Sequence, residues 1–315
     1  MCGLSGMLGT PDPSIVNKMV SLQHHRGPDG SGLWHDSEVC LGHVRLAIVD
    51  LEGSPQPIQS QEGNVLIANG EIYNFESIRS SLSSYSWTTF GDSETILALF
   101  EQTSRGNQNA SAKDHGAWIQ QLDGMFAFAL WNPVNHQLIL ARDEMGIKPL
   151  IRTRVGDSLL FSSEVKALRA HPEYKPQLDE CALMARLVWE YPLDATTLFA
   201  DVHQVRPGTV EVWSLKEGVP VLVDSLRFSN PRIEPVTAYN ESLGAQRLLD
   251  GFIDSVGQRL MSDVPVGIVL SGGLDSSLVA AVANDAAQRY DRPTPECWTV
   301  AESEDNPDWV AAELV

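Results

Sequence analysis

The stretch VPVGIVLSGGLDSS, residues 264–277, carries the clearest structural signal in the chain. An uninterrupted apolar run ends at Leu270 and helix-forming residues begin near Asp275, so the stretch predicts a buried strand, a glycine-rich loop and a helix. A helical pattern from Glu241 precedes it, and residues 297–300 predict another strand after it. Strand, helix and strand in this order are typical of a βαβ unit in a parallel sheet, which helices normally cover on both faces.

The loop of this stretch has the properties of a phosphate site. Gly272 and Gly273 lack the Cβ atoms that would keep a phosphate away from the backbone. A helix N-terminus offers unpaired N–H groups and a positive dipole end, and Ser271, Ser276 and Ser277 add hydroxyl donors. The loop does not end in Gly-Lys-Ser/Thr, so it is not a Walker P-loop. We expect it to bind nucleotide phosphates; a glycine-rich helix cap without a ligand is the alternative.

Working outward, the composition limits the classes of function. The chain has 315 residues, which corresponds to roughly two domains, and 43% of them are hydrophobic, as in a globular protein. Its 22 Lys and Arg against 41 Asp and Glu give a net charge of −19, which disfavours nucleic acid or an anionic membrane as partner. No apolar run approaches the ~20 residues of a membrane span, and the N-terminus lacks a signal-peptide pattern. We therefore expect a cytoplasmic enzyme.

The four cysteines are far apart and form no Cys-x-x-Cys or Cys/His cluster; they are Cys2, Cys40, Cys181 and Cys297. This spacing argues against a structural zinc site and against a disulfide framework. The neighbouring His24 and His25 have no acidic or cysteine partner at metal-ligand spacing, so we do not assign them to a metal. Nothing in the sequence calls for an organic prosthetic group.

The first ~190 residues predict an α+β domain with mostly antiparallel strands. The predicted helices are 93–101, which follows Asp92 as a natural N-cap, and 180–189. Residues 191–240 are interpreted as a connector with a hairpin that contains a strand at 209–213, and residues 241–315 as an incomplete parallel-sheet domain. The runs that predict strands in the first part are 39–50, 64–69, 124–131, 137–141 and 158–161.

Cys2 follows the initiator methionine directly. Removal of Met1 would leave a cysteine whose α-amino group lies beside its own thiol. An α-amine titrates near ~7.7–8.0 and can act as a general base at neutral pH, which makes an N-terminal cysteine a possible nucleophile. Taken alone, the residue is weak evidence for a nucleophile, because a lone cysteine is far more often structural.

Nine segments together resemble one family, the class II glutamine amidotransferases, and most closely its glutamine-dependent asparagine synthetases. Their order and spacing agree along essentially the whole chain. The segments are MCGLSGM (1–7), HHRGPDGSG (24–32), GHVRLAIVDL (42–51), NGEIYN (69–74), GDSETI (91–96), LDGMFAFALW (122–131), ARDEMGIKPL (141–150), FSSEVKAL (161–168) and SDVPVGIVLSGGLDSS (262–277).

The resemblance implies an N-terminal-nucleophile fold and a role for each matching residue. Cys2 would attack the side-chain amide of glutamine, form a thioester and release ammonia. Asn69 and the N–H of Gly70 would form the oxyanion hole. The residues that would bind glutamine are Arg45, Leu46, Ala47, Ile48, Val49, Asn69, Gly70, Glu71 and Asp92, with Arg45 on the α-carboxylate and the two acids on the α-ammonium. Arg45 as a strand residue, Asn69–Gly70 as a turn and Asp92 as a helix cap are the structural alternatives.

In this family the ammonia reaches a second domain, where ATP activates the β-carboxylate of aspartate and ammonia displaces AMP. The resemblance implies that Asp275 is a candidate Mg²⁺ ligand, with a plain N-cap role as the alternative, and Asp308 matches a later acidic position less securely. The residues that match the family's ATP contacts are Leu270, Ser271, Gly272, Gly273, Leu274, Asp275, Ser276 and Val300. Arg142, Asp143 and Lys148 are interpreted as a buried ion pair and a turn.

The parallel-sheet part, residues 241–315, is too short for the usual sheet of about four to six strands. We therefore expect a chain that is truncated at its C-terminus, that hydrolyses glutamine without making asparagine, and that forms a homodimer or needs a partner chain to complete the sheet. A stand-alone glutaminase or ammonia-supplying subunit, amidation of a different carboxylate, and a non-catalytic relative are the alternatives. Retention of Cys2 and Asn69 argues against the last of these.

Overall fold

The computed structural model describes residues 1–104, 110–229 and 240–315. Contacts between Cα atoms divide the chain into a first unit, residues 1–231, and a second unit, residues 232–315. The domain boundaries 1–190, 191–240 and 241–315 stay a prediction, and residues 230–239 of the expected connector lie outside the described residues.

The first unit contains two six-stranded antiparallel sheets. The first has the strand order β10-β8-β9-β1-β3-β2, with the bounds His203–Gln204, Ile151–Val155, Ser158–Ser162, Gly3–Leu8, Val39–Arg45 and Gly30–His35. The second has the order β12-β11-β7-β6-β5-β4, with the bounds Val219–Arg227, Thr209–Lys216, Gln137–Arg142, Gly124–Asn132, Val65–Ile72 and Ile58–Gln59. Apolar side chains from both sheets, among them Leu4, Trp131 and Phe161, form one buried cluster between them.

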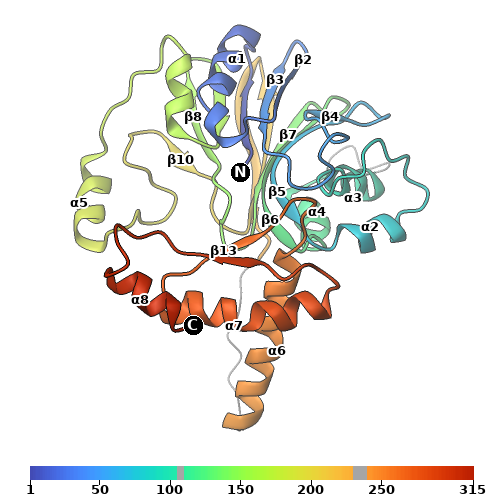
Figure 1. The fold of residues 1–315 in the computed structure, drawn as a ribbon. Coiled ribbons are helices and arrows are strands. Elements are labelled where there is room, and N and C mark those ends of the chain that lie inside the picture. The colour runs from blue at the N-terminus through green and yellow to red at the C-terminus, as the bar shows by residue number, and fades with distance from the viewer. Residues whose placement is uncertain (105–109, 230–239) are drawn as a thin grey trace. The chain divides into compact units, whose positions relative to one another are not determined.

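Helices cover the outer face of each sheet (Figure 1). On the first sheet lie α1 (Pro13–Ser21) and the 3₁₀ helices η1 (His24–Arg26) and η2 (Val165–Ala170). On the second lie α2 (Phe75–Ser81), α3 (Glu94–Ser104) and α4 (Ala112–Ile119), and α5 (Glu180–Trp189) follows η2 along the chain. The result is a layered α+β fold, as the sequence predicts.

The sequence of β6 explains how the second sheet fills two cores at once. Phe126 and Phe128 point to the cluster under α3 and α4, whereas Ala127, Ala129 and Trp131 point to the cluster between the sheets. This alternation follows from the period of two in a β-strand. Both faces of β6 are buried, which accounts for its almost continuous apolar run.

The predicted strand 39–50 ends earlier, at Arg45. The guanidinium of Arg45 donates hydrogen bonds to the carbonyls of Val49 (3.1 Å), Asp50 (2.5 Å) and Leu51 (2.9 Å). These bonds curl the following residues around the side chain, so residues 48–53 form bends and turns and do not extend the strand.

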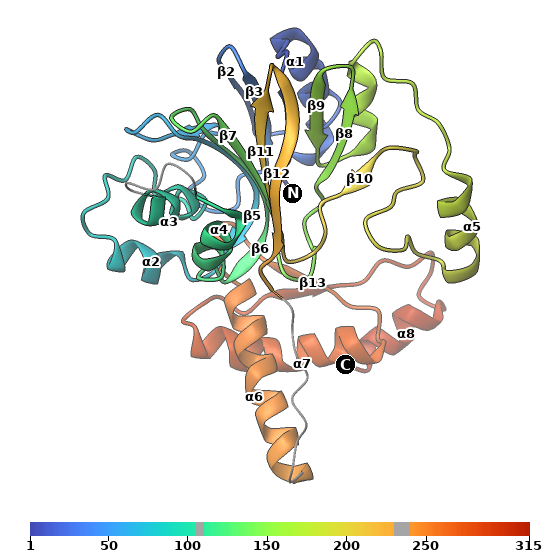
Figure 2. The ribbon, with the colours of Figure 1, turned by 180° about the vertical axis from the view of Figure 1, so that it is seen from behind.

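The hairpin expected between residues 191 and 240 is formed by β11 and β12 (Figure 2). It belongs to the second sheet, because β11 also pairs along its length with β7. The segment is therefore structurally continuous with the first unit.

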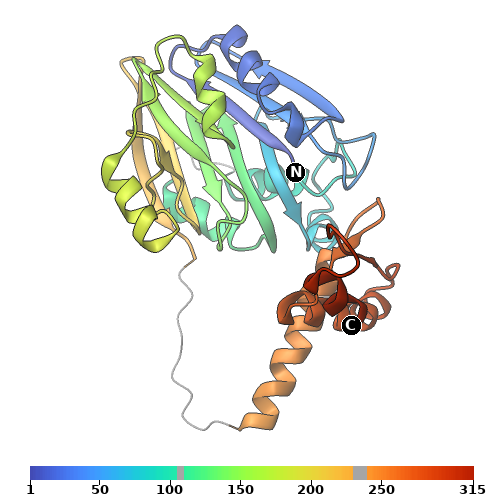
Figure 3. The ribbon, with the colours of Figure 1, turned by 60° about the vertical axis from the view of Figure 1, so that its left-hand side comes forward.

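The second unit contains α6 (Glu241–Arg259), β13 (Gly267–Val269), α7 (Leu274–Arg289), β14 (Glu296–Trp298) and α8 (Pro307–Glu313); Figure 3 shows α6 as one long helix. β13 and β14 pair in parallel, as predicted. β13 is shorter than the expected run 264–270. The prediction that it is buried was wrong, since Val269 is 75% exposed. Within the described residues the parallel sheet has two strands only, which leaves side chains of both uncovered.

None of the helices in the described parts of the chain combines the length and the apolar character that crossing a membrane requires.

Candidate active site

The Cys2 thiol lies directly before β1, a strand in the interior of the first sheet. Its Sγ accepts a hydrogen bond from the Leu46 N–H at 3.4 Å and lies 3.6 Å from the Leu46 carbonyl oxygen. The Cys2 carbonyl accepts a hydrogen bond from Nε of Arg26 at 2.9 Å. The cysteine is thus held between the turn that follows Arg45 and the end of η1.

Burial and neighbouring charges both act on this thiol. Burial raises the pKa of Cys2, and the charge of Glu71 raises it further, whereas the hydrogen bond with Leu46, the α-amino group and Arg45 lower it. Burial also lowers the pKa of the Met1 α-amino group. This amine belongs to Met1, and it is a different group from the amine that Cys2 would carry once Met1 is removed.

Asn69 is a buried amide without a partner. It lies in the middle of β5 and is 1% exposed, yet neither its Oδ1 nor its Nδ2 has a hydrogen-bond partner among the described residues. Buried polar groups are almost always hydrogen-bonded, so an unpartnered buried amide makes Asn69 a candidate functional residue. Asn69 and Glu71 are two residues apart on one strand and therefore share a face, and the charge of Glu71 acts on Cys2.

The N–H of Gly70 points to the edge of β5 that faces away from β6. The N–H of Ala68 on that edge binds Gln56 Oε1 (2.6 Å), and the N–H of Ile72 binds Asp92 Oδ2 (2.7 Å). The N–H of Gly70 has the same direction, because backbone groups alternate along a strand. A Cβ at this position would lie 2.1 Å from the Met125 carbonyl oxygen, so only glycine fits.

Glu71 and Asp92 are two interacting carboxylates, of which Asp92 is buried and Glu71 is half-buried. Burial and the charge of Asp92 raise the pKa of Glu71 to about 8, although Lys148 opposes the shift. Burial likewise raises the pKa of Asp92, although its carboxylate accepts the Ile72 N–H. Two carboxylates that resist ionisation without a counter-charge suit a cationic ligand such as an α-ammonium group.

The remaining residues assigned to glutamine lie on the turn after β3. Arg45, Leu46, Ala47, Ile48 and Val49 are all half-buried. Asp50 links this turn to the Asp92 segment, because its Oδ2 accepts the Phe90 N–H at 3.0 Å. The Arg45 guanidinium already donates hydrogen bonds to three carbonyls of its own turn. A substrate carboxylate that binds Arg45 would accept hydrogen bonds from the same guanidinium.

Lys148 is a cation that the sequence interpretation missed as part of this site. The side chain of Asp143 accepts the N–H groups of Met145, Ile147 and Lys148, and so forms the predicted turn. The Arg142 guanidinium donates to the Gly146, Lys148 and Val205 carbonyls and to Gln204. The charge of Asp143 acts on both Arg142 and Lys148, and a direct ion pair between them stays a prediction. Lys148 is 5% exposed, and its charge acts on Glu71, Cys2 and the α-amino group. The sequence signal that could have assigned Lys148 to the site is the family-matching segment ARDEMGIKPL, residues 141–150.

In the second unit the residues matched to ATP lie around the N-terminus of α7. Gly273 is the N-cap and Gly272 has a φ of +71°, a backbone conformation that favours glycine. Ser276 Oγ accepts the Ser271 N–H at 3.3 Å, and the Leu270 N–H binds the Trp298 carbonyl at 2.8 Å. Asp275 and Val300 are exposed. Within the described residues no group of three or more His, Cys, Asp or Glu side chains is arranged to hold a metal ion.

Two antiparallel sheets packed face to face, with a cysteine at position 2 before an interior strand, define the class of N-terminal-nucleophile amidotransferase folds. The Bacillus subtilis glutamine phosphoribosylpyrophosphate amidotransferase, solved with ADP and GMP, aligns with 95% of this chain and 65% of its own at a TM-score of 0.53 and 17% identity. A structure described as the allosteric regulatory enzyme of purine biosynthesis covers 99% of this chain and 70% of its own, at a TM-score of 0.51 and 18% identity. These likenesses show the fold.

The glutamine amidotransferase domain model matches residues 1–220, and the asparagine synthase model matches residues 247–315. The chain therefore belongs to the glutamine amidotransferase family. Asparagine synthetase [glutamine-hydrolyzing] 3 of Bacillus subtilis is 34% identical over 90% of this chain and 45% of its own length, and the Sandersonia aurantiaca asparagine synthetase [glutamine-hydrolyzing] is 34% identical over 90% and 46%. The chain thus spans less than half the length of these relatives. The resemblance predicted from the motifs is confirmed.

The raised pKa of Glu71 predicts a pH-dependent effect of Glu71→Gln on stability. Between the ordinary value of 4.5 and the value of about 8 in the folded protein, the native state holds a proton that the unfolded chain has lost. The free energy of unfolding of the wild type therefore falls as pH rises through this window, whereas a glutamine is unaffected. We expect E71Q to gain stability relative to the wild type from pH 5 to pH 8 in urea unfolding.

Glu76→Gln, at an exposed position in the first turn of α2, is the control and should show no such trend. A difference between E71Q and the wild type that stays constant across this pH range would contradict the electrostatic account of the acidic pair.

Proposed function

We propose that the first unit hydrolyses the side-chain amide of glutamine and releases ammonia. The observation that carries this proposal is the buried amide of Asn69, which has no partner among the described residues. Asn69 shares a strand face with Glu71, and the charge of Glu71 acts on the Cys2 thiol. An amide-hydrolysing site needs a nucleophile, a proton acceptor and donors for the developing oxyanion. Each of these has a candidate among the residues described above.

In the proposed reaction, removal of Met1 places the α-amino group on Cys2, where it accepts the thiol proton. The thiolate attacks the amide carbon, a C–S bond forms, and Asn69 Nδ2 and the Gly70 N–H donate to the oxyanion. The C–N bond then breaks, and the leaving nitrogen takes the proton from the amine and departs as ammonia. Water hydrolyses the thioester, which gives glutamate and restores the thiol.

Substrate binding follows the charges of the pocket. Glu71 and Asp92 are proposed to bind the α-ammonium group of glutamine, and Arg45 its α-carboxylate. The main chain of Leu46, Ala47, Ile48 and Val49 would line the same pocket. The arrangement is supported by the short chain of contacts from Arg45 through Asp50 to the Asp92 segment.

For the second unit we propose ATP binding at the start of α7, as part of an amidation of aspartate by way of an acyl-adenylate, with ammonia displacing AMP, that requires a completed parallel sheet. The residues involved would be Leu270, Ser271, Gly272, Gly273, Leu274, Asp275, Ser276 and Val300. The match of residues 247–315 to the asparagine synthase model and the glycine-rich helix N-terminus support this assignment. Mg²⁺ would neutralise the charge of the triphosphate; its carboxylate ligand would be Asp275, which is exposed and therefore accessible to a metal–nucleotide complex.

One amino-acid analysis tests both halves. The 315-residue chain is incubated with glutamine, aspartate and Mg-ATP, and glutamate and asparagine are counted together, with reactions lacking ATP or aspartate as controls. We expect glutamate without asparagine from this polypeptide, because the two described parallel strands leave side chains of the sheet uncovered. Absence of glutamate would contradict the amidotransferase proposal.

The second candidate is a glutaminase or ammonia-supplying subunit, and the exposed two-stranded sheet is the observation that favours it. Asparagine formed in step with glutamate would exclude this candidate. The use of a different carboxylate acceptor, a cytoplasmic location, and a homodimer or a partner chain that completes the sheet stay predictions.

A further inference from the structure

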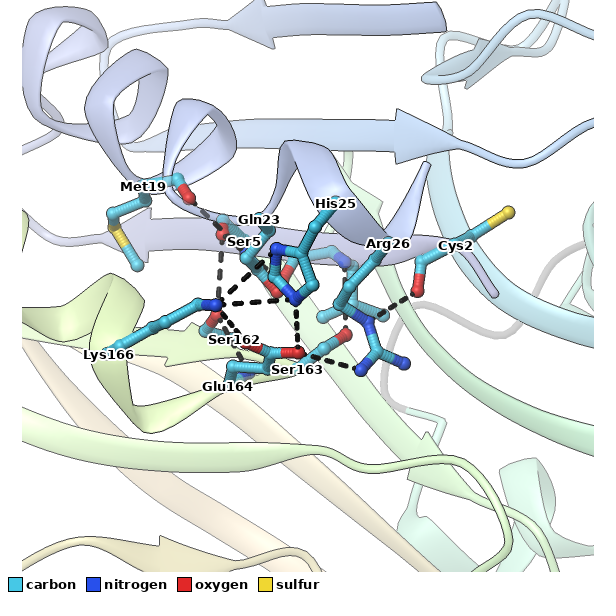
Figure 4. A network of polar contacts seen from close by, with 11 residues as sticks. Cys2, Ser5, Met19, Gln23, His25, Arg26, Ser162, Ser163, Glu164 and Lys166 are labelled. Atoms are coloured by element: carbon cyan, nitrogen blue, oxygen red, sulfur yellow. Dashed lines mark hydrogen bonds and ion pairs between the residues drawn. The ribbon is translucent and has the colours of Figure 1, made fainter. Parts of the chain in front are cut away.

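One carboxylate, which Arg26 links to Cys2, contacts two cationic side chains and a histidine (Figure 4). Glu164 lies 3.0 Å from His25 Nε2, 2.9 Å from Arg26 Nη1 and 3.0 Å from Lys166 Nζ. The side chains of His25 and Lys166 are about half exposed, whereas that of Arg26 is 10% exposed. Although burial opposes it, hydrogen bonds from Arg26, Lys166 and His25 lower the pKa of Glu164 to about 2, so the group is an anion at all working pH values.

The most buried of these cations contacts the nucleophile. The guanidinium of Arg26 binds Glu164 through Nη1, and its Nε donates to the Cys2 carbonyl oxygen at 2.9 Å. The ladder of β1 begins one residue later, where Gly3 pairs with Val44. In the described part of the chain, the bond from Arg26 is the one hydrogen bond found for the Cys2 main chain outside that ladder.

Glu164 itself extends from a fixed base. It lies two residues after β9, whose Ser162 pairs with Ser5 of β1, and its N–H binds Ser162 Oγ at 3.3 Å. The neighbouring Ser163 N–H binds the Leu4 carbonyl at 2.9 Å. The main chain next to Glu164 is therefore bonded to β1, the strand that directly follows Cys2. From this position the Glu164 carboxylate can hold the guanidinium of Arg26 in one place.

We propose that Glu164 is a positioning residue for the Cys2 nucleophile: it orients Arg26, and Arg26 fixes the main chain of Cys2. This inference rests on the proposed role of Cys2 in attacking glutamine. Arg26 Nη2 is buried without a partner in the described residues. Without the Glu164 charge, the largely buried guanidinium loses its carboxylate partner and turns away from Cys2.

The test compares Glu164→Gln with Glu164→Asp and with a matched control, Glu38→Gln. The amide of E164Q keeps the size of the side chain and one acceptor oxygen but removes the charge, and the aspartate of E164D restores the charge on a shorter stem. Glu38 forms a similar surface contact with a histidine, 2.6 Å from His136 Nδ1, at the opposite end of β3 from Arg45. The readouts are kcat and KM for glutamate release and the rate of Cys2 alkylation by iodoacetamide from pH 6 to pH 9.

We expect E164Q to lower kcat by roughly tenfold with KM within twofold, since small misplacements of a reacting group are costly. The pH profile of Cys2 alkylation should shift in E164Q, return partly in E164D and stay unchanged in E38Q. A kcat and an alkylation profile of E164Q within twofold of the wild type would overturn the proposal.

If E164Q does not fold, Arg26→Lys is the second variant that tests the positioning role. A lysine keeps the cation near Glu164 but cannot bind the Cys2 carbonyl and the carboxylate in the same bridging geometry. A wild-type alkylation profile in R26K would overturn the inference, and a shifted one supports it. If the wild type releases no glutamate, the proposed function fails, whereas the alkylation profile, which needs no glutamine, still decides the positioning role.

Discussion

Replacing Cys2 by alanine is expected to reduce glutamate release by roughly 10³-fold or more, because the variant has no atom to form the thioester. The thiol is held between the Leu46 main chain and the Arg26 contact on the Cys2 carbonyl, where the charges of Glu71 and Lys148 act on it. Neither contact is part of a hydrophobic core, so the melting temperature of C2A should differ from that of the wild type by only a few degrees. Glutamate release under saturating glutamine measures the effect.

Cys181→Ser is the matched control, since Cys181 is an exposed free thiol on α5. It should retain wild-type activity. A C2A protein that keeps more than a tenth of the wild-type rate would show that another group attacks glutamine.

Asn69→Ala is expected to lower kcat by roughly 10²- to 10³-fold, the cost of removing one oxyanion donor. KM should change little, because the oxyanion forms only in the tetrahedral intermediate. Neither polar atom of Asn69 has a partner in the described residues, so the substitution breaks no internal hydrogen bond there. Large loss of activity with little loss of stability is the expected signature, measured by glutamate release and thermal unfolding.

Asn132→Ala is the control with the opposite expectation. Asn132 lies at the far end of β6, and its Oδ1 accepts the N–H groups of Val134 and Asn135 in the turn to β7. N132A should lower the melting temperature and leave kcat unchanged. If N69A and N132A lose activity and stability in proportion, Asn69 is a structural residue and the oxyanion assignment is wrong.

Much of the fold was predictable because local patterns decide it. The strands around Phe126–Phe128 and Leu138–Leu140, and the helices that begin at Glu180 and Glu241, follow from apolar runs and helix caps. The exposure of β13 was not predictable, because an apolar run reports a preference for burial and not whether other strands are available to cover it.

The site was predictable where a family-matching segment such as NGEIYN, residues 69–74, contains short residues that lie on a strand, such as Asn69 and Gly70. It was not predictable where long side chains choose between partners. The sequence does not reveal that the Arg45 guanidinium binds the carbonyls of its own turn, that the charge of Lys148 acts on Glu71, or that Glu164 contacts His25, Arg26 and Lys166. The Arg45 contacts are local, but the contacts of Lys148 with the site and of Glu164 with His25 and Arg26 join segments far apart in the chain, which only the folded sheets bring together.

Covalent labelling by a diazo-ketone analogue of glutamine tests the nucleophile most directly. The intact mass first reports whether Met1 has been removed, and peptide mapping then locates the adduct. We predict one adduct per chain, on the Cys2 thiol, and protection by glutamine. An adduct on Cys181 or Cys297 that glutamine blocks, or glutamate release from a chain that forms no adduct at Cys2, would contradict the assignment of Cys2 as the nucleophile.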